Sequence, residues 1–105
     1  MSRFEVWLVG LDPAVGSEIR KTRPCVVVSP DDLNHQLHTL IVCPMASRIW
    51  NAPFRVVSHF AGHDGSVALD QMSAVDRRRL VRRLGRLDED TASQILRRLA
   101  EMFAP

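Results

Sequence analysis

The sequence predicts a small, mostly antiparallel β-barrel of the α+β class, with five or six short strands followed by one helix. Two observations support this fold class. Short apolar and β-branched runs alternate with turn residues through most of the chain, and helical periodicity is clear only near its end. Because no helical pattern separates the early strands, a βαβ fold with a parallel sheet is excluded.

Length and composition are those of one soluble globular domain spanning residues 1–105. The chain has 105 residues, of which 46% are hydrophobic and 25% are charged. Its longest apolar runs are too short to cross a bilayer. The first residues also lack the long apolar core and cleavage site of a signal peptide, so we expect a cytoplasmic protein.

Five segments have the composition of strands: 5–11, 24–29, 38–44, 54–58 and 66–72. The segments 12–22 and 46–53 contain breakers and are expected to be loops, and 30–36 is expected to be a polar connection. Asp64 and Gly65 form a typical hairpin signal and predict a turn between the fourth and fifth strands.

The pattern changes in the last third of the chain. Residues 74–87 place leucines at helical spacing, but Gly85 interrupts them, so we expect a short helical turn and then a short strand. Asp88 can cap a final helix, and Glu89 and Asp90 fall in its first turn, where the helix dipole favours acids. The apolar face of this helix is expected to consist of Ile95, Leu96, Leu99, Met102 and Phe103.

Cysteines and charge give weaker indications. Cys25 and Cys43 lie in apolar runs far apart in the sequence, which favours reduced, buried thiols over a disulfide, and their spacing does not support a zinc site.

The net charge is only +2, although 13 of the 14 basic residues are arginine. Arginine suits phosphate, but an arginine-rich genome explains the same bias, so charge alone is weak evidence for nucleic acid.

Five stretches occur in an order that resembles the MazF/PemK family of bacterial toxins: VWLVGLDPAVGSE, KTRPCVVVSP, IVCPMASR, VALDQ and VDRRRLVRRLGRL. The resemblance covers nearly the whole chain. It implies the SH3-like barrel shared with CcdB-type toxins, a homodimer, and a MazE/PemI-like antitoxin that lays a disordered acidic segment into the RNA groove. It also implies cleavage of single-stranded RNA at short sequences without the ribosome, a metal or another cofactor.

The resemblance assigns catalysis to Arg23. Cleavage of RNA without a metal proceeds by attack of a 2′-hydroxyl on the adjacent phosphate, and it needs fixed positive charge at that phosphate. Arg23 matches the family's catalytic arginine, and Pro24 with the strand behind it would hold the side chain rigidly. On residue type alone, a surface arginine that flanks a strand is the simpler interpretation.

The second catalytic position departs from the family pattern. The threonine that the family usually carries after the strand falls on Ala46, and a hydroxyl is present one residue later, at Ser47. Neighbours in a strand point to opposite faces, but neighbours in a loop need not. Ser47 therefore either replaces the threonine or is an ordinary loop serine beside a weakened site.

The resemblance also indicates five RNA-binding residues: Glu18, Arg20, Arg48, Asp70 and Gln71. Glu18 matches an acid at the rim of the groove, and the two arginines lie in loops that would flank it. Asp70 and Gln71 match the family's DQ pair, for which turn and cap hydrogen bonds are the alternative explanation.

Other polar groups have simpler explanations. We expect ordinary loop histidines rather than a metal site at His35, His38, His59 and His63. The arginine-rich segment 77–86 is expected to be a solvated face, with ion pairs to Asp76 or Asp88. Trp50 could stack on a base, cover the antitoxin groove or simply be partly buried.

Three rival functions remain open. A CcdB-type gyrase poison needs no phosphate-cleaving arginine, so the retained TRP stretch argues against it. A non-catalytic homologue that binds RNA or antitoxin is supported by Ala46 and by Ser73 and Ala74, which stand where the family often has arginine and threonine. A structural or interaction protein of another class is the least favoured.

Overall fold

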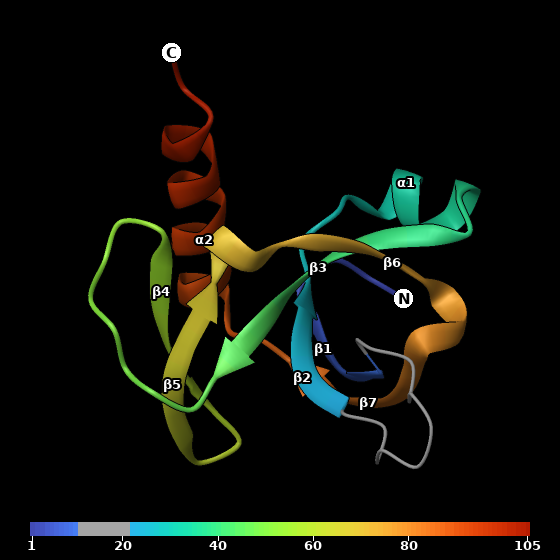
Figure 1. The fold of residues 1–105 in the computed structure, drawn as a ribbon, viewed down its shortest axis with the longest axis horizontal. Helices are drawn as coiled ribbons and strands as arrows, with labels where there is room; N and C mark the ends of the chain where they lie inside the picture. Colours follow the sequence, from blue (N-terminus) through green and yellow to red (C-terminus); the bar gives the residue numbers. More distant parts are fainter. Residues whose placement is uncertain (11–21) are drawn as a thin grey trace, which may run out of the picture.

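The computed structural model describes residues 1–10 and 22–105 (Figure 1). The described strands are β1 (Glu5–Gly10), β2 (Thr22–Val27), β3 (Thr39–Ala46), β4 (Arg55–Phe60), β5 (His63–Ala68), β6 (Ser73–Asp76) and β7 (Leu80–Arg86). The helices are α1 (Asp31–Gln36) and α2 (Glu89–Met102), with 3-10 turns η1 (Leu69–Gln71) and η2 (Arg77–Arg79). This mostly β chain with one long C-terminal helix confirms the predicted fold class.

The described strands form one strongly bent antiparallel sheet in the order β4-β5-β3-β2-β1-β7, with β6 paired to β3 off this path. Strand β3 makes the bend possible because its two halves have different partners. Its first half, from Thr39 to Val42, pairs with β6, and its end, Met45 and Ala46, pairs with β5. Figure 1 shows the β4–β5 hairpin swung away from β1, β2 and β7, with α2 beside β4.

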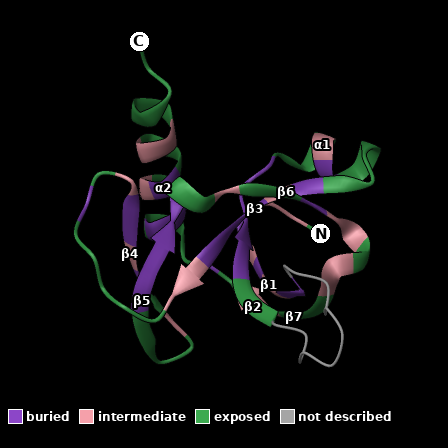
Figure 2. Cartoon of the chain, in the orientation of Figure 1, coloured by how far each residue is buried: buried purple, intermediate pink, exposed green. Residues whose placement is uncertain are grey.

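Two apolar clusters fill the two sides of the central strands, as Figure 2 shows in purple on β2, β3 and β5. Val26 on β2 belongs to the cluster that Ile95 of α2 covers, whereas its neighbours Cys25 and Val27 belong to the other. Successive residues of a strand point to opposite faces, which explains this split. A near-continuous apolar run in β2 is therefore needed because both of its faces are buried.

The final helix begins where the sequence predicts. The Asp88 carboxylate accepts hydrogen bonds from the Thr91 backbone N–H at 3.2 Å and from the Thr91 hydroxyl at 2.6 Å. Ile95 is fully buried, but the predicted apolar face is only partly covered, since Phe103, just beyond the helix, is 71% exposed. No helix among the described residues is long and apolar enough to cross a membrane.

Two local predictions are wrong. Residues 31–36 form helix α1 rather than an irregular connection, and the buried Asn34 amide of this helix donates to the Ser29 carbonyl at 2.9 Å. The hairpin turn lies at Ala61 and Gly62, whose φ angles are 53° and 77°, and not at Asp64–Gly65. Two successive positive φ angles are typical of a two-residue hairpin turn. Segment 73–76 forms a strand that was not predicted, whereas the expected turn and strand within 74–87 are confirmed as η2 and β7.

Both cysteines are free and buried, as predicted. They lie on neighbouring strands but belong to different apolar clusters, so their side chains point to opposite faces of the sheet. Burial raises the pKa of Cys25 to about 12, although the nearby Arg23 charge opposes the shift. Burial likewise raises the pKa of Cys43 to about 12.

Candidate active site

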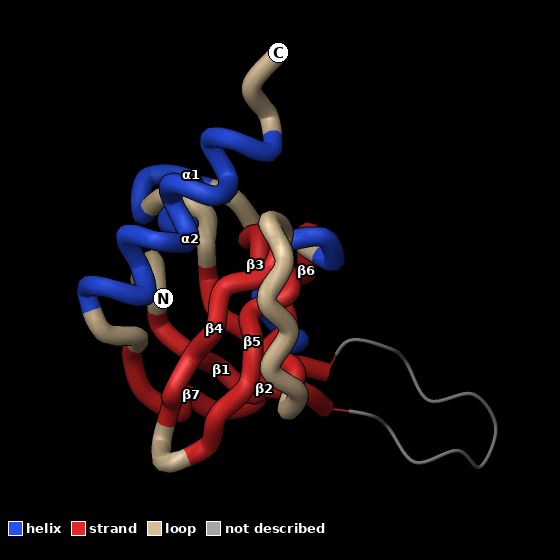
Figure 3. Tube along the Cα trace, turned by 90° about the vertical axis from the view of Figure 1, so that its left-hand side faces the viewer, coloured by secondary structure: helices blue, strands red, loops and turns tan. Residues whose placement is uncertain are grey.

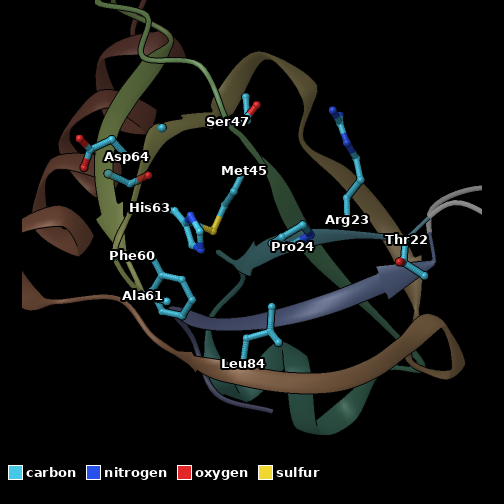
Figure 4. Close-up of a pocket in the computed structure, with 14 residues that line it drawn as sticks. Thr22, Arg23, Pro24, Met45, Ser47, Phe60, Ala61, His63, Asp64 and Leu84 are labelled. Atoms are coloured by element: carbon cyan, nitrogen blue, oxygen red, sulfur yellow. The ribbon is translucent and has the colours of Figure 1, made fainter.

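A groove of about 690 Å³ opens between β2, the end of β3 and the β4–β5 hairpin (Figure 4). Arg23 and Ser47, which were predicted to act together, both line it. Its apolar part is formed by Pro24, Met45, Phe60 and Leu84. The groove thus combines a cation and a hydroxyl with an apolar floor.

Arg23 is available to bind an anion. It lies on β2 opposite Val9 and is exposed, and its guanidinium has no hydrogen-bond or ion-pair partner in the described part of the chain. Pro24 follows with a fixed φ, and the fully buried Cys25 comes next, so the backbone behind the guanidinium is anchored in the core. Figure 4 shows the Arg23 side chain extending from β2 toward the level of Ser47.

Ser47 is held in the groove by the strand that ends one residue before it. Ala46 pairs with Ser66 on β5, and the fully buried Ser66 hydroxyl donates to the Arg48 carbonyl at 2.8 Å. The backbone on both sides of Ser47 is therefore fixed. Ala46 also lines the groove. The position at which the family usually has threonine therefore faces the groove without a hydroxyl, and the adjacent Ser47 supplies one.

The β4–β5 hairpin contributes a residue that sequence reasoning did not place at the site. His63 lines the groove, and Figure 4 shows its ring beside Met45, on the side opposite Arg23. Asp64 also lines the groove, but its carboxylate is bound to His59 Nδ1 at 2.6 Å. The described residues contain no group of three or more His, Cys, Asp or Glu that could hold a metal ion.

The predicted RNA-binding residues are distributed unevenly. Glu18 and Arg20 lie outside the described residues. Arg48 is exposed directly after Ser47, and its guanidinium has no partner among the described residues. Asp70 and Gln71 do not line the groove; Asp70 instead lines a second cavity of about 400 Å³, together with Pro53, Phe54, Arg98, Glu101 and Met102.

Asp70 is bound to a buried arginine. The Arg55 side chain is only 9% exposed, and its Nε and Nη2 donate to the two Asp70 oxygens at 2.8 Å and 3.3 Å. This bidentate geometry fixes both side chains. A direct role of Asp70 in binding RNA remains a prediction, because its carboxylate is already engaged.

The arginine-rich segment forms ion pairs: the one to Asp76 was predicted, and the one to Glu5 was not. Arg78 pairs with Asp76 at 3.1 Å, while Arg83 pairs with Glu5 at 2.7 Å. The alternative partner, Asp88, caps α2 instead. Burial alone would raise the pKa of Glu5, but hydrogen bonds from Ser2, Arg83 and Trp7 lower it to about 2.

The bent sheet and its groove define a small, mostly β half-barrel protein, in which Arg23 and Ser47 line a candidate anion site. Family comparison agrees: the family described as PemK-like, MazF-like toxin of type II toxin-antitoxin system matches residues 2–103. The chain belongs to this family.

Individual relatives match over nearly their full lengths. The chain is 35% identical to endoribonuclease PemK of Escherichia coli, over 98% of this chain and 82% of the relative. It is 34% identical to endoribonuclease MazF9 of Mycobacterium tuberculosis, over 90% of this chain and 89% of the relative. A crystal structure of MazE-MazF from Deinococcus radiodurans superposes with a TM-score of 0.82 and 25% identity, covering 97% of this chain and 94% of that one.

Proposed function

We propose that this protein is the toxin of a type II toxin–antitoxin system and a sequence-specific endoribonuclease that cleaves single-stranded RNA. The observation that carries this proposal is the shared groove, in which an Arg23 without a partner among the described residues faces the same space as Ser47. The two relatives described above are both named endoribonucleases.

The reaction follows from the chemistry of the groove. The 2′-oxygen of one nucleotide attacks the adjacent phosphorus and the bond to the 5′-oxygen breaks, which gives a 2′,3′-cyclic phosphate and a 5′-hydroxyl. The 2′-hydroxyl loses its proton and the leaving 5′-oxygen gains one. Arg23 stabilises the charge that grows on the phosphoryl oxygens, and the Ser47 hydroxyl donates a hydrogen bond to the same group. No step requires a metal or the ribosome.

Partners follow from family membership. One solved relative is described as a MazE-MazF complex. We infer that this chain binds a MazE/PemI-like antitoxin through a disordered acidic segment, which would compete with RNA for the cationic groove. A homodimer and a cytoplasmic location belong to the same proposal.

A catalytically weakened homologue that binds RNA or antitoxin is the second candidate. Ala46 favours it, since this position lines the groove without a hydroxyl. Ser73 and Ala74 lie in β6, where they pair with Val42 and Ile41, and neither lines the groove. Their departure from the family pattern therefore bears less directly on catalysis than Ala46 does.

One assay separates the two candidates. Purified protein is incubated in EDTA with a long unstructured RNA, beside Arg23→Ala, Ser47→Ala and the control Arg82→Ala, which removes an exposed arginine outside the groove. Discrete cuts with cyclic-phosphate ends, lost only in the groove variants, are expected. Folded wild-type protein that leaves diverse RNAs intact would favour the binding homologue. Ala46→Thr would then be the first variant to test for restored cleavage.

A further inference from the structure

The connection between β3 and β4, residues 47–54, is fixed from outside at both ends. Near its start, the Ser66 hydroxyl holds the Arg48 carbonyl at 2.8 Å. Near its end, Arg98 Nη1 on α2 donates to the carbonyls of Ala52 at 3.0 Å and Pro53 at 3.2 Å. Figure 3 shows this tan connection running on the outside of the β4–β5 hairpin. These hydrogen bonds fix the backbone near both ends of the segment, so its side chains are held in place for contact with a ligand.

Trp50, in the middle of this connection, is held by the buried ion pair described above. The Arg55 guanidinium carbon lies 4.7 Å from the centroid of the Trp50 ring, a cation–π contact. Phe54 makes a T-shaped contact with the same ring at 5.2 Å and 89°. Asp70 in turn fixes Arg55. Despite these contacts, Trp50 remains 48% exposed, so an oriented aromatic surface is open to a ligand.

Trp50 does not line the groove, but a short stretch of chain joins it to Ser47, which does. Trp50 follows Ser47 by three residues, so their Cα atoms are at most about 11 Å apart. Between them stands Arg48, exposed and with no side-chain partner among the described residues. Hydroxyl, cation and aromatic ring thus succeed one another along a single fixed segment. Positive charge combined with stacking aromatics is how proteins bind single-stranded nucleic acid.

We propose that Trp50 stacks on a base of the RNA beside the cleaved step, that Arg48 contacts an adjacent phosphate, and that Asp70 positions Trp50 through Arg55. This inference rests on the proposed RNA-cleaving function. A base is favoured over an acidic peptide because the face of an aromatic ring is negative, which attracts another π-system in offset stacking but not a carboxylate. Asp70 is thereby a positioning residue rather than a direct RNA contact.

Fluorescence tests the stacking directly. The chain has two tryptophans, so Trp7→Phe leaves Trp50 as the only reporter, and Trp50→Phe leaves Trp7 as the matched control. The probe is a single-stranded 2′-fluoro RNA of mixed sequence, which lacks the attacking hydroxyl. Saturable quenching is expected in Trp7→Phe and not in Trp50→Phe. RNA binding seen by anisotropy without quenching of Trp50 would overturn the proposal, as would quenching by an acidic peptide alone.

Kinetics test whether the stacking serves catalysis. Trp50→Leu is expected to raise KM roughly 5- to 150-fold, the range that corresponds to the stacking of one base, with kcat nearly unchanged. Trp50→Phe should retain most of the affinity. Asp70→Asn should raise KM and reduce the quenching amplitude while Asp70→Glu restores part of both, a pattern that simple destabilisation does not produce.

The two proposals fail in different ways. Wild-type protein that binds but never cleaves RNA would contradict the proposed function. Wild-type protein that cleaves RNA, with Trp50→Leu at an unchanged KM, would contradict the stacking alone.

Discussion

Gly65 on β5 lies so close to Ala46 on β3 that a Cβ atom at residue 65 would stand 2.1 Å from the Ala46 carbonyl oxygen. The contact occurs where β3 ends and the segment carrying Ser47 begins. Residue 65 is therefore glycine because a side chain there would displace the end of β3, which lines the groove, and not because a turn needs it.

Gly65→Ala is expected to push the end of β3 away from β5. The backbone of residue 65 fixes the position of its Cβ, and the Ala46 oxygen belongs to the backbone, so relief requires a strand to move. We expect this to cost on the order of 1–3 kcal/mol. The melting temperature should fall by several degrees, and kcat should fall as Ser47 shifts.

The matched control is Gly62→Asn, at the hairpin turn. Gly62 has a φ of 77°, which asparagine tolerates, and no atom lies within 4 Å of a Cβ built there. Gly62 itself lines the groove, so this control is judged by stability, and its melting temperature should match that of wild type. Equal losses of melting temperature in both variants would show that the hairpin as a whole, rather than the Gly65–Ala46 contact, sets the stability.

The same contact explains why part of the fold could not be predicted. The final helix and the described strands other than β6 follow from local patterns, and those were predicted. Asp64–Gly65 looks like a hairpin signal, but the glycine is required by a strand distant in sequence, and the turn uses Ala61 at a φ of 53° that its residue type does not suggest. Helix α1 was missed because six mostly polar residues show no clear period.

The candidate site shows the same division. The resemblance to a family predicted Arg23 and Ser47, and the structure places both in one groove. It could not show that Asp70 is bound to Arg55, a residue 15 positions away, and that Arg55 supports Trp50. These relationships depend on the register of strands and on a loop path, which a linear sequence does not contain.

Arg23→Lys tests whether the site needs a guanidinium or only a charge. An ammonium is a point charge without the planar fork that binds two phosphate oxygens together. We expect kcat to fall roughly 10- to 100-fold, with RNA affinity at low salt nearly retained. Arg82→Lys is the control. Full activity in Arg23→Lys would mean that this residue acts only through its charge.

The two thiols should be inert in the folded protein. Burial raises the pKa of each to about 12, so at about pH 8 roughly one thiol in 10⁴ is ionised. An aromatic disulfide reagent should therefore react with neither thiol in native buffer and with both in guanidinium chloride. Fast reaction of one thiol in native protein would contradict the packing of its strand.

The ion pair between Glu5 and Arg83 should make the free energy of unfolding depend on pH in the acid range. Hydrogen bonds hold the folded-state pKa of Glu5 at about 2, below its ordinary value of 4.5. A depressed pKa contributes stability that is fully present above about pH 4.5 and is lost as the pH falls toward 2. Glu5 is 14% exposed, and we expect a contribution of roughly 1–3 kcal/mol.

Urea unfolding of Glu5→Gln measures this contribution. At neutral pH the variant should have a lower free energy of unfolding than wild type, and the difference should shrink between about pH 4.5 and 2. Arg83→Gln should reproduce part of the loss, because Arg83 donates the 2.7 Å bond that joins β7 to β1. A difference between wild type and Glu5→Gln that stays constant down to pH 2 would mean that Glu5 stabilises the sheet by packing, not by its charge.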